Sequence, residues 1–253
     1  MNDFQYPVVP AVPEAPALTQ GQRLIYTFTA PSKTFFDIKR STSWWLPFLL
    51  GVIATYALFF AVQTKVGWSQ VAENSIRMSP KRSEQLDKLT PEQRAANMKI
   101  AVVMTEAIFA AFPIFSLITV AIIAGVLLAT INFGFGGKAN FWEVFSVSWY
   151  AGLPGLIKVL LGVIALFAGM APESFNSQNF SGTNIGFYLP PETSKPLLAL
   201  ATSLDVITIW TLVLSAIGLS VVAGTKRSSA YIVVFGWWIV VVLVGVGSAA
   251  AFS

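Results

Sequence analysis

Three ionisable residues stand in or beside long apolar runs of the sequence: Glu106, Lys158 and Asp205. A charge at membrane depth costs about 2.5 to 3.5 kcal/mol on insertion scales, so each needs an opposite charge, water or an escape to the interface. Carboxylates that share a cavity can bind a cation or relay protons. These three residues are therefore the candidate intramembrane polar site of the chain.

The sequence offers few other groups for catalysis. Its 253 residues include no histidine and no cysteine, which excludes Ser-His-Asp triads, thiol nucleophiles and zinc sites made of histidine and cysteine. An aspartyl protease needs two carboxylates close together, and the Gly-x-Gly-Asp surroundings expected of the intramembrane class are missing. We therefore predict no catalytic residue, no metal site and no cofactor, in a protein that is not an enzyme.

Composition places the chain in a membrane. Hydrophobic residues make up 55% of it and charged residues 11%, whereas a soluble domain carries about 25% charged residues. The net charge of +4 comes from basic residues in loops rather than from a stripe interleaved with aromatic side chains, so we predict no binding of nucleic acid. The expected partner of these loop charges is the anionic surface of the lipid bilayer.

Five apolar runs are long enough to cross a bilayer, whose hydrocarbon core takes about 20 helical residues. The second run contains Pro113 and is longer than a bilayer requires, so we expect it to be tilted, kinked or partly outside the lipid. The fold class is therefore all-α, a polytopic membrane helical bundle occupying residues 44–253, with the two termini on opposite sides. The predicted spans are residues 45–63, 103–131, 146–170, 204–223 and 229–251.

Two segments precede the first span. Residues 1–21 are rich in proline, which denies backbone donors and favours extended conformations, so we predict a disordered tail. Residues 22–43 form an interfacial amphipathic segment with a short helix that starts at Pro31, apolar toward acyl chains and basic toward head groups. The tryptophans next to the first span match an aromatic belt. The predicted anchors are Phe35, Phe36, Lys39, Arg40, Trp44 and Trp45.

The position of Lys158 depends on where the third span begins. If the span begins near Leu153, the lysine is one turn inside and reaches back to the surface. If it begins near Val144, Lys158 is close to the middle of the membrane and must face another helix or a polar cavity. Trp149 and Tyr150 are typical interface residues, which favours the first arrangement.

Glu106 and Asp205 stand where the second and fourth spans enter from the same side. They are either solvated span ends at head-group level or an acidic pair that binds a cation or relays protons. Asp205 has a further local explanation, because an acid in the first turn of a helix interacts favourably with the helix dipole.

Two features predict helix contacts. Gly155, Gly162 and Gly169 recur every seven residues and allow close approach of another helix, either within the bundle or in an oligomer. The loop of residues 64–102 ends in "LTPEQRAANMK", where Thr90 and Gln93 form a capping box. A helix should therefore begin outside the membrane and run into the second span, as a surface extension or as a docking surface for an unknown protein partner.

Loop charges favour a cytoplasmic N-terminus, because cytoplasmic loops carry an excess of lysine and arginine. Seven basic residues then lie inside: Arg23, Lys33, Lys39, Arg40, Lys138, Lys226 and Arg227. The loop of residues 64–102 opposes this orientation, since it places seven basic residues outside, although its length and its acidic residues weaken the objection.

Three stretches resemble the bacterial branch of the Yip (Ypt/Rab-interacting protein) membrane family. They are "IYTFTAPSKTFFDIKRSTSWWLPFLL", "INFGFGGKANFWEVFSVSWYAGLP", and "NIGFYL" followed by "SLDVITIWTLVLSAIGLSVVAGTKRSSA". The resemblance implies a five-span helical protein of the bacterial cytoplasmic (inner) membrane, with its N-terminus in the cytoplasm and its C-terminus outside.

The leading hypothesis is a non-enzymatic scaffold, adaptor or membrane-organising protein that acts through homo- or hetero-oligomers of its transmembrane helices. The alternative is a small ion or solute transporter or channel that uses Glu106, Asp205 and Lys158, and it requires these three side chains to face one cavity.

Overall fold

The computed structural model describes residues 16–190 and 192–251, so most of the predicted disordered tail lies outside the described residues. The regular elements of the described part are helices, with one isolated antiparallel bridge between Asn184 and Asp205. This confirms the predicted all-α class.

Five helical segments of the described chain are long and apolar enough to cross a membrane, as the sequence predicted. The first, fourth and fifth start or end within a few residues of the predicted limits, whereas the second starts nine residues later and the third starts five residues earlier. The segments are α3 (Trp45–Lys65), α7 (Phe112–Phe135), α8 with α9 (Phe141–Ala151 and Gly155–Phe167), α11 (Val206–Ala223) and α12 (Arg227–Ala251).

The second span begins late because the helix before it is interrupted. Helix α6 (Pro91–Ala110) starts at the predicted capping box, in which the Thr90 hydroxyl accepts from the Gln93 backbone and the Gln93 side chain accepts from the Thr90 backbone. It ends near Pro113, which has no N–H to continue the helical ladder. The Tyr56 hydroxyl donates to the Ala110 carbonyl oxygen at this break (3.0 Å). The helix expected to run from the capping box into the second span is therefore two helices, α6 and α7, with the break beside Pro113, where the sequence favoured a kink.

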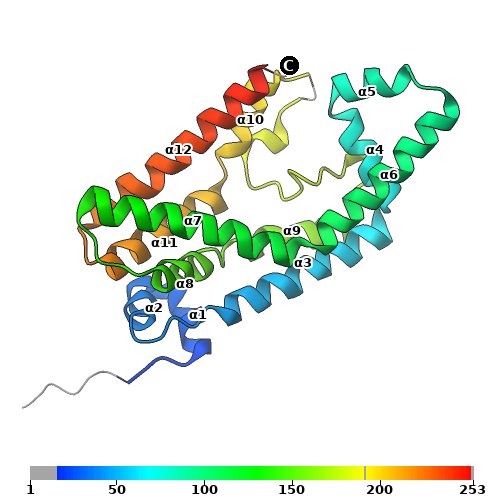
Figure 1. The fold of residues 1–253 in the computed structure, drawn as a ribbon. Coiled ribbons are helices and arrows are strands. Elements are labelled where there is room, and N and C mark those ends of the chain that lie inside the picture. Colours follow the sequence, from blue (N-terminus) through cyan, green and yellow to red (C-terminus); the bar gives the residue numbers. More distant parts are fainter. Residues whose placement is uncertain (1–15, 191, 252–253) are drawn as a thin grey trace, which may run out of the picture.

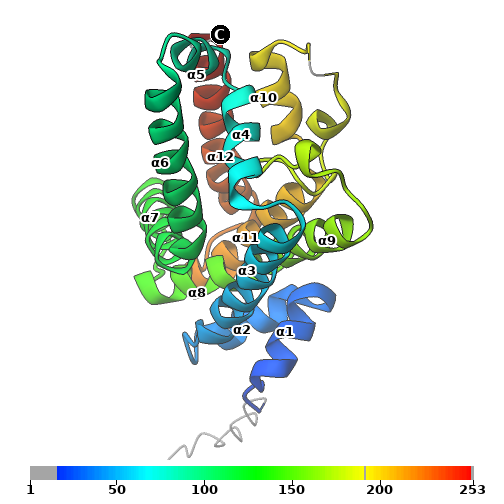
Figure 2. The same cartoon turned by 90° about the vertical axis from the view of Figure 1, so that its right-hand side faces the viewer.

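Helices α1 (Gln20–Thr29) and α2 (Pro31–Ile38) lie at one end of the bundle (Figures 1 and 2). The turns of residues 136–140 and 224–226 lie at the same end, since the Lys138 N–H donates to the Ala223 carbonyl oxygen (3.0 Å). The Arg227 guanidinium also donates to the Ser32 hydroxyl (3.1 Å). We call this end, formed by α1, α2, residues 39–44 and the two turns with the first turns of α8 and α12 that follow them, the N-terminal face.

The opposite end, the far face, carries α5, α10 and the last turns of α12 in both views (Figures 1 and 2). The Asn74 side chain ties this region together, because its amide donates to the carbonyl oxygens of Pro172 and Phe175, both at 2.9 Å. Because five helical segments run between the two faces, the beginning and the end of the described chain lie at opposite ends of the bundle. The elements between the spans at this face are α4 (Trp68–Arg77), α5 (Pro80–Asp87), η1 (Pro172–Ser174), η2 (Ile185–Tyr188) and α10 (Lys195–Ser203).

The main core joins α2, α7, α8, α11 and α12, and a second apolar cluster joins α3, α4 and α9. Phe35 of α2 is fully buried in the main core, whereas Phe36 is 62% exposed. A Cβ atom on Gly218 of α11 would lie 3.0 Å from the Phe35 ring and 2.5 Å from Cγ1 of Val147. Phe35 therefore packs into a glycine-lined site on the protein, which differs from the acyl-chain contact that the sequence analysis expected.

We predict that Gly218→Ala lowers the free energy of unfolding by about 1 to 3 kcal/mol, because overpacking forces neighbouring side chains to move. Thermal unfolding in detergent measures the effect. Gly236→Ala is the matched control in α12, since no heavy atom lies within 4 Å of a Cβ built there. Equal unfolding temperatures for the two variants would contradict the packing of Phe35 on Gly218.

Candidate functional site

Lys158 and Asp205 form an ion pair inside the bundle. Nζ of Lys158 lies 3.0 Å from Oδ2 of Asp205, and their side chains are 32% and 2% exposed, respectively. The pair joins α9 to the start of α11, two segments 47 residues apart in the sequence. Each charge supplies the opposite charge that the other requires in a medium of low polarity.

Asp205 holds an interruption between two helices. Helix α10 ends at Ser203 and α11 begins at Val206, and both helices pack along α12. The Thr208 N–H donates to Oδ1 of Asp205 (2.9 Å), which makes Asp205 the N-cap of α11, and the Thr183 hydroxyl donates to Oδ2 (2.6 Å). The Val206 N–H donates to the Thr183 carbonyl oxygen (3.1 Å). Polar groups freed by the interruption are thus satisfied by protein, as an apolar environment requires.

The surroundings of Asp205 stabilise its ionised form. The Thr183 hydroxyl and the Thr208 N–H donate to this carboxylate, and the Lys158 ammonium lies 3.0 Å from it. Hydrogen bonds to a carboxylate and a nearby cation both favour its charged form.

The third membrane segment begins at Phe141 rather than near Leu153. In the next turn after Lys158, a Cβ on Gly162 would lie 3.6 Å from Cδ1 of Leu58, which belongs to the middle of α3. Lys158 therefore lies beside the central part of α3 and pairs with Asp205. The pairing with Asp205 is the contact with another helix that the second arrangement considered from the sequence requires.

Glu106 lies apart from this ion pair, exposed on α6. The ring of Phe109, one turn further along α6, is 5.1 Å from the ring of Trp68, the first residue of α4 on the far face. Glu106 does not line the cavity at Lys158. The structure thus brings together two of the three candidate residues, and the described residues include no cluster of three acidic side chains that could hold a metal ion.

The three glycines of the seven-residue repeat have different roles. A Cβ on Gly162 would lie 2.4 Å from the Phe180 ring, so this glycine allows close packing of the far-face loop on α9. Gly169 follows the end of α9 with a φ of +103°, and Gly155 starts α9 beside open space. Close packing at Gly162 is within the chain, and the other two glycines make no close helix contact.

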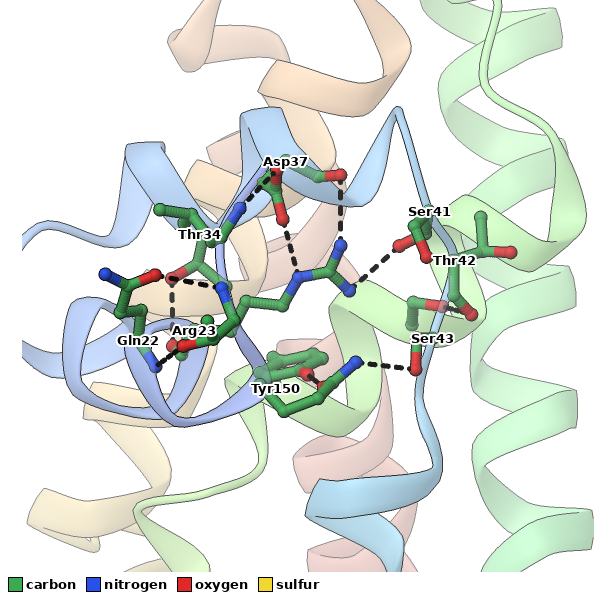
Figure 3. Close-up of polar contacts among 12 residues, drawn as sticks. Gln22, Arg23, Thr34, Asp37, Ser41, Thr42, Ser43 and Tyr150 are labelled. Atoms are coloured by element: carbon green, nitrogen blue, oxygen red, sulfur yellow. Dashed lines mark hydrogen bonds and ion pairs between the residues drawn. The ribbon is translucent and has the colours of Figure 1, made fainter. Parts of the chain in front are cut away.

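A second buried ion pair fixes the N-terminal face (Figure 3). Nε of Arg23 in α1 donates to Oδ2 of Asp37 in α2 (2.7 Å), and Nη1 donates to the Ser41 carbonyl oxygen (2.9 Å). The two side chains are 3% and 5% exposed. This pair joins α1, α2 and the segment that leads into α3.

Further hydrogen bonds join this region to α8. The Tyr150 hydroxyl donates to Oε1 of Gln20 (2.6 Å), and Nε2 of Gln20 donates to the Ser43 hydroxyl (2.8 Å). The Ser146 hydroxyl donates to the Thr42 carbonyl oxygen (2.8 Å). Helices α1 and α2 are therefore docked on the bundle by directional bonds as well as by Phe35.

The sequence analysis missed this network because it counted Arg23 among the loop charges. Two local signals were available. Thr19 and Gln22 form a capping box at the start of α1, and Asp37 is the one acid in residues 22–43. Neither signal identifies the partner, since the pairing depends on how α1 folds back on α2.

The predicted anchors divide between the core and the surface. Trp44 stacks with Trp149 at a ring distance of 6.3 Å, whereas Trp45 is 50% exposed.

The exposed cations of the N-terminal face are Lys33, Lys39, Arg40, Lys138, Lys226 and Arg227. Among the described residues, the acids of this face are Asp37 and Glu143, and both are buried. The exposed charge of this face is therefore positive.

A bundle of apolar crossing helices with internally paired charges defines the class of polytopic helical membrane proteins. Within this class, the Yip1 domain family model matches residues 25–249, so the chain belongs to the Yip1 family. This confirms the resemblance at the level of the family. No curated protein and no solved structure matches the chain.

We predict that Arg23→Gln lowers the free energy of unfolding by about 3 to 5 kcal/mol, because it leaves the Asp37 carboxylate buried without a counter-charge. Thermal unfolding and proteolysis of the N-terminal helices measure the loss. Arg94→Gln is the matched control, since Arg94 and its partner Asp87 are more than half exposed. Recovery by Arg23→Met combined with Asp37→Leu is expected, and an unaffected single variant would contradict the role of the pair.

Asp205→Asn should lower the free energy of unfolding at neutral pH by about 1 to 3 kcal/mol, because the interaction with the Lys158 charge is lost. The asparagine side-chain oxygen can still accept the N-cap hydrogen bond from Thr208. Protonation of Asp205 in acid removes the negative charge that pairs with Lys158, and the contribution of the pair to stability is lost with it. The difference between wild type and variant should therefore shrink in acid. Unfolding temperatures measured from neutral to acidic pH test this, with Asp87→Asn as the exposed control.

Proposed function

We propose that this Yip1-family protein is a non-enzymatic scaffold or adaptor that organises other proteins at the membrane through its N-terminal face. The observation that carries the proposal is the docking of α1 and α2 on the bundle by the buried Arg23–Asp37 pair. A surface that is ordered before binding loses less conformational freedom when a partner binds. The N-terminal face therefore has the rigidity of a recognition surface.

The surface chemistry of this face supports the same function. Ile25 and Phe36 are 61% and 62% exposed on α1 and α2, near the exposed cations of the face. Apolar side chains beside positive charge suit a partner segment that is both acidic and apolar, because charge complementarity orients the encounter and apolar burial stabilises it. Homo- or hetero-oligomers through the membrane helices are part of this proposal.

The proposed location is the bacterial cytoplasmic (inner) membrane, with the N-terminal face in the cytoplasm and the end of α12 outside. The positive N-terminal face supports this orientation, since short cytoplasmic loops concentrate lysine and arginine. The basic residues of the far face are mixed with acids, as in the exposed pair of Arg94 and Asp87 at 3.4 Å. Because acids accompany them, the basic residues of the far face argue only weakly for the reverse orientation.

A thiol crosslinker attached through Ser41→Cys is predicted to capture a specific protein from native membranes. The chain has no cysteine of its own, so each variant carries one reactive position. Ser41 is exposed on the N-terminal face, whereas Ser146 is fully buried and serves as the matched Ser→Cys control. Lys33→Glu with Lys226→Glu should reduce capture by about tenfold, because like charges then face the acidic partner.

Charge reversal on the far face, Lys88→Glu with Lys99→Glu, should leave capture unchanged. A membrane-impermeant maleimide should label Ser174→Cys in intact cells and Ser41→Cys after permeabilisation, since they lie on opposite faces. Capture that is equal in the two charge-reversed proteins, or absent from Ser41→Cys, would refute the scaffold proposal. Labelling of Ser41→Cys in intact cells would refute the orientation.

A further inference from the structure

Glu106 is an acid without a counter-charge on the surface of the bundle. Its side chain is exposed on α6, and no ion pair within the described part of the chain includes it. One turn further along α6, the Ala110 carbonyl oxygen accepts from the Tyr56 hydroxyl (3.0 Å). Tyr56 lies in the middle of the 21-residue helix α3, which is a membrane-crossing segment. The end of α6 therefore lies at the level of the middle of α3.

This contact places Glu106 at membrane depth. Figures 1 and 2 show α6 running from α5 at the far face back along the bundle to α7. The four residues from Ala110 to Glu106 rise about 6 Å toward the far face, whereas the helix from Tyr56 to the end of α3 at Lys65 rises about 13.5 Å. Glu106 therefore lies within the length of α3. A carboxylate exposed to acyl chains at this level is costly unless another group pairs with it.

The surface of α6 beside Glu106 is apolar. Its exposed residues recur at intervals of three and four, which is the spacing of one helix face. This apolar stripe consists of Ile100, Val103, Met104, Ala107 and Ile108. Acyl chains cover such a stripe as well as another helix does, because both are apolar. The carboxylate at the edge of the stripe, and not the stripe itself, therefore requires a protein partner.

We propose that α6 binds a transmembrane helix of another protein, and that this helix carries one lysine or arginine at the depth of Glu106. The attraction between the two charges is strong in a medium of low polarity, and the cation donates charge-assisted hydrogen bonds to the carboxylate. The apolar stripe packs against the rest of the partner helix. This inference rests on the scaffold function proposed above and deepens it, because it names the chemistry of one partner inside the membrane.

A second copy of the chain does not supply this cation. Two copies related by a two-fold axis along the membrane normal place the same residues at the same depth. Glu106 of one copy then lies level with Glu106 of the other, and like charges disfavour ionisation of both. The nearest cation on α6, Lys99, is seven residues closer to the far face, which is about 10.5 Å along the helix. The proposed partner is therefore a different protein.

Binding of designed membrane-spanning peptides to the full chain in lipid vesicles tests the proposal. The peptides contain about 20 leucine and alanine residues, with lysine, leucine or glutamate at one position about one turn from the middle. The chain has no cysteine of its own, so a donor dye is attached through Ser174→Cys, and energy transfer to a dye on the peptide measures binding at neutral pH. We expect the lysine peptide to bind about tenfold more tightly than the leucine peptide.

Glu106→Gln should remove the preference for the lysine peptide, because the amide carries no charge. Glu92→Gln is the matched control and should keep the preference, since Glu92 is exposed in the first turn of the same helix, far from Glu106. Glu106→Lys should instead prefer the glutamate peptide, because the charge on α6 is reversed.

Three results would overturn the proposal. The first is equal binding of the lysine and leucine peptides by the protein with Glu106 intact. The second is an unchanged preference for lysine in Glu106→Gln. The third is energy transfer between two copies of the chain that depends on Glu106 in the absence of peptide, which would assign the apolar stripe to a second copy. Capture through Ser41→Cys is a separate measurement, so failure at α6 is distinguishable from failure of the N-terminal face.

Discussion

The need to satisfy every charge that leaves water governs the architecture of this protein. Burial in a medium of low polarity strengthens the attraction between opposite charges, and an unpaired charge there is strongly destabilising. Two ion pairs in the described part of the chain meet this need, Arg23–Asp37 in the N-terminal helices and Lys158–Asp205 inside the bundle.

The two ion pairs have different structural consequences. Arg23–Asp37 folds α1 back on α2 and, with the bonds to Tyr150 and Ser43, presents the N-terminal face as one unit with the bundle. Lys158–Asp205 instead holds an interruption between α10 and α11, where the far-face loop supplies the missing hydrogen bonds. Irregular backbone is tolerated at such a place when it is buried in protein or lines a cavity, and here a polar cavity adjoins it.

These two regions also separate two properties of this member of the Yip1 family. The N-terminal face concentrates exposed positive charge because its acids, Asp37 and Glu143, are turned into the protein and satisfied there. The cavity at Lys158 has no net charge from its ion pair but retains unused donors. The basic surface and the cavity beside the Lys158–Asp205 pair are thus chemically different environments in separate parts of one small bundle.

The sequence by itself determined the features that depend on local composition. The number of membrane-crossing segments follows from apolar run length, the start of α6 follows from Thr90 and Gln93, and the break before α7 follows from the missing N–H of Pro113. The family also follows from the sequence, through residues 25–249. The spans, the helix start and the break depend on residues close together in the sequence, so they can be predicted without the tertiary structure.

Only the tertiary structure decided which distant groups meet. It placed Phe35 against Gly218 instead of lipid, paired Asp37 with Arg23, and joined Lys158 to Asp205 while Glu106 remained apart. The residue type shows that an apolar side chain needs burial and that a charged side chain away from water needs a counter-charge. The partner that satisfies it is set by the relative position of whole helices, and this position depends on long-range packing that local sequence patterns do not encode.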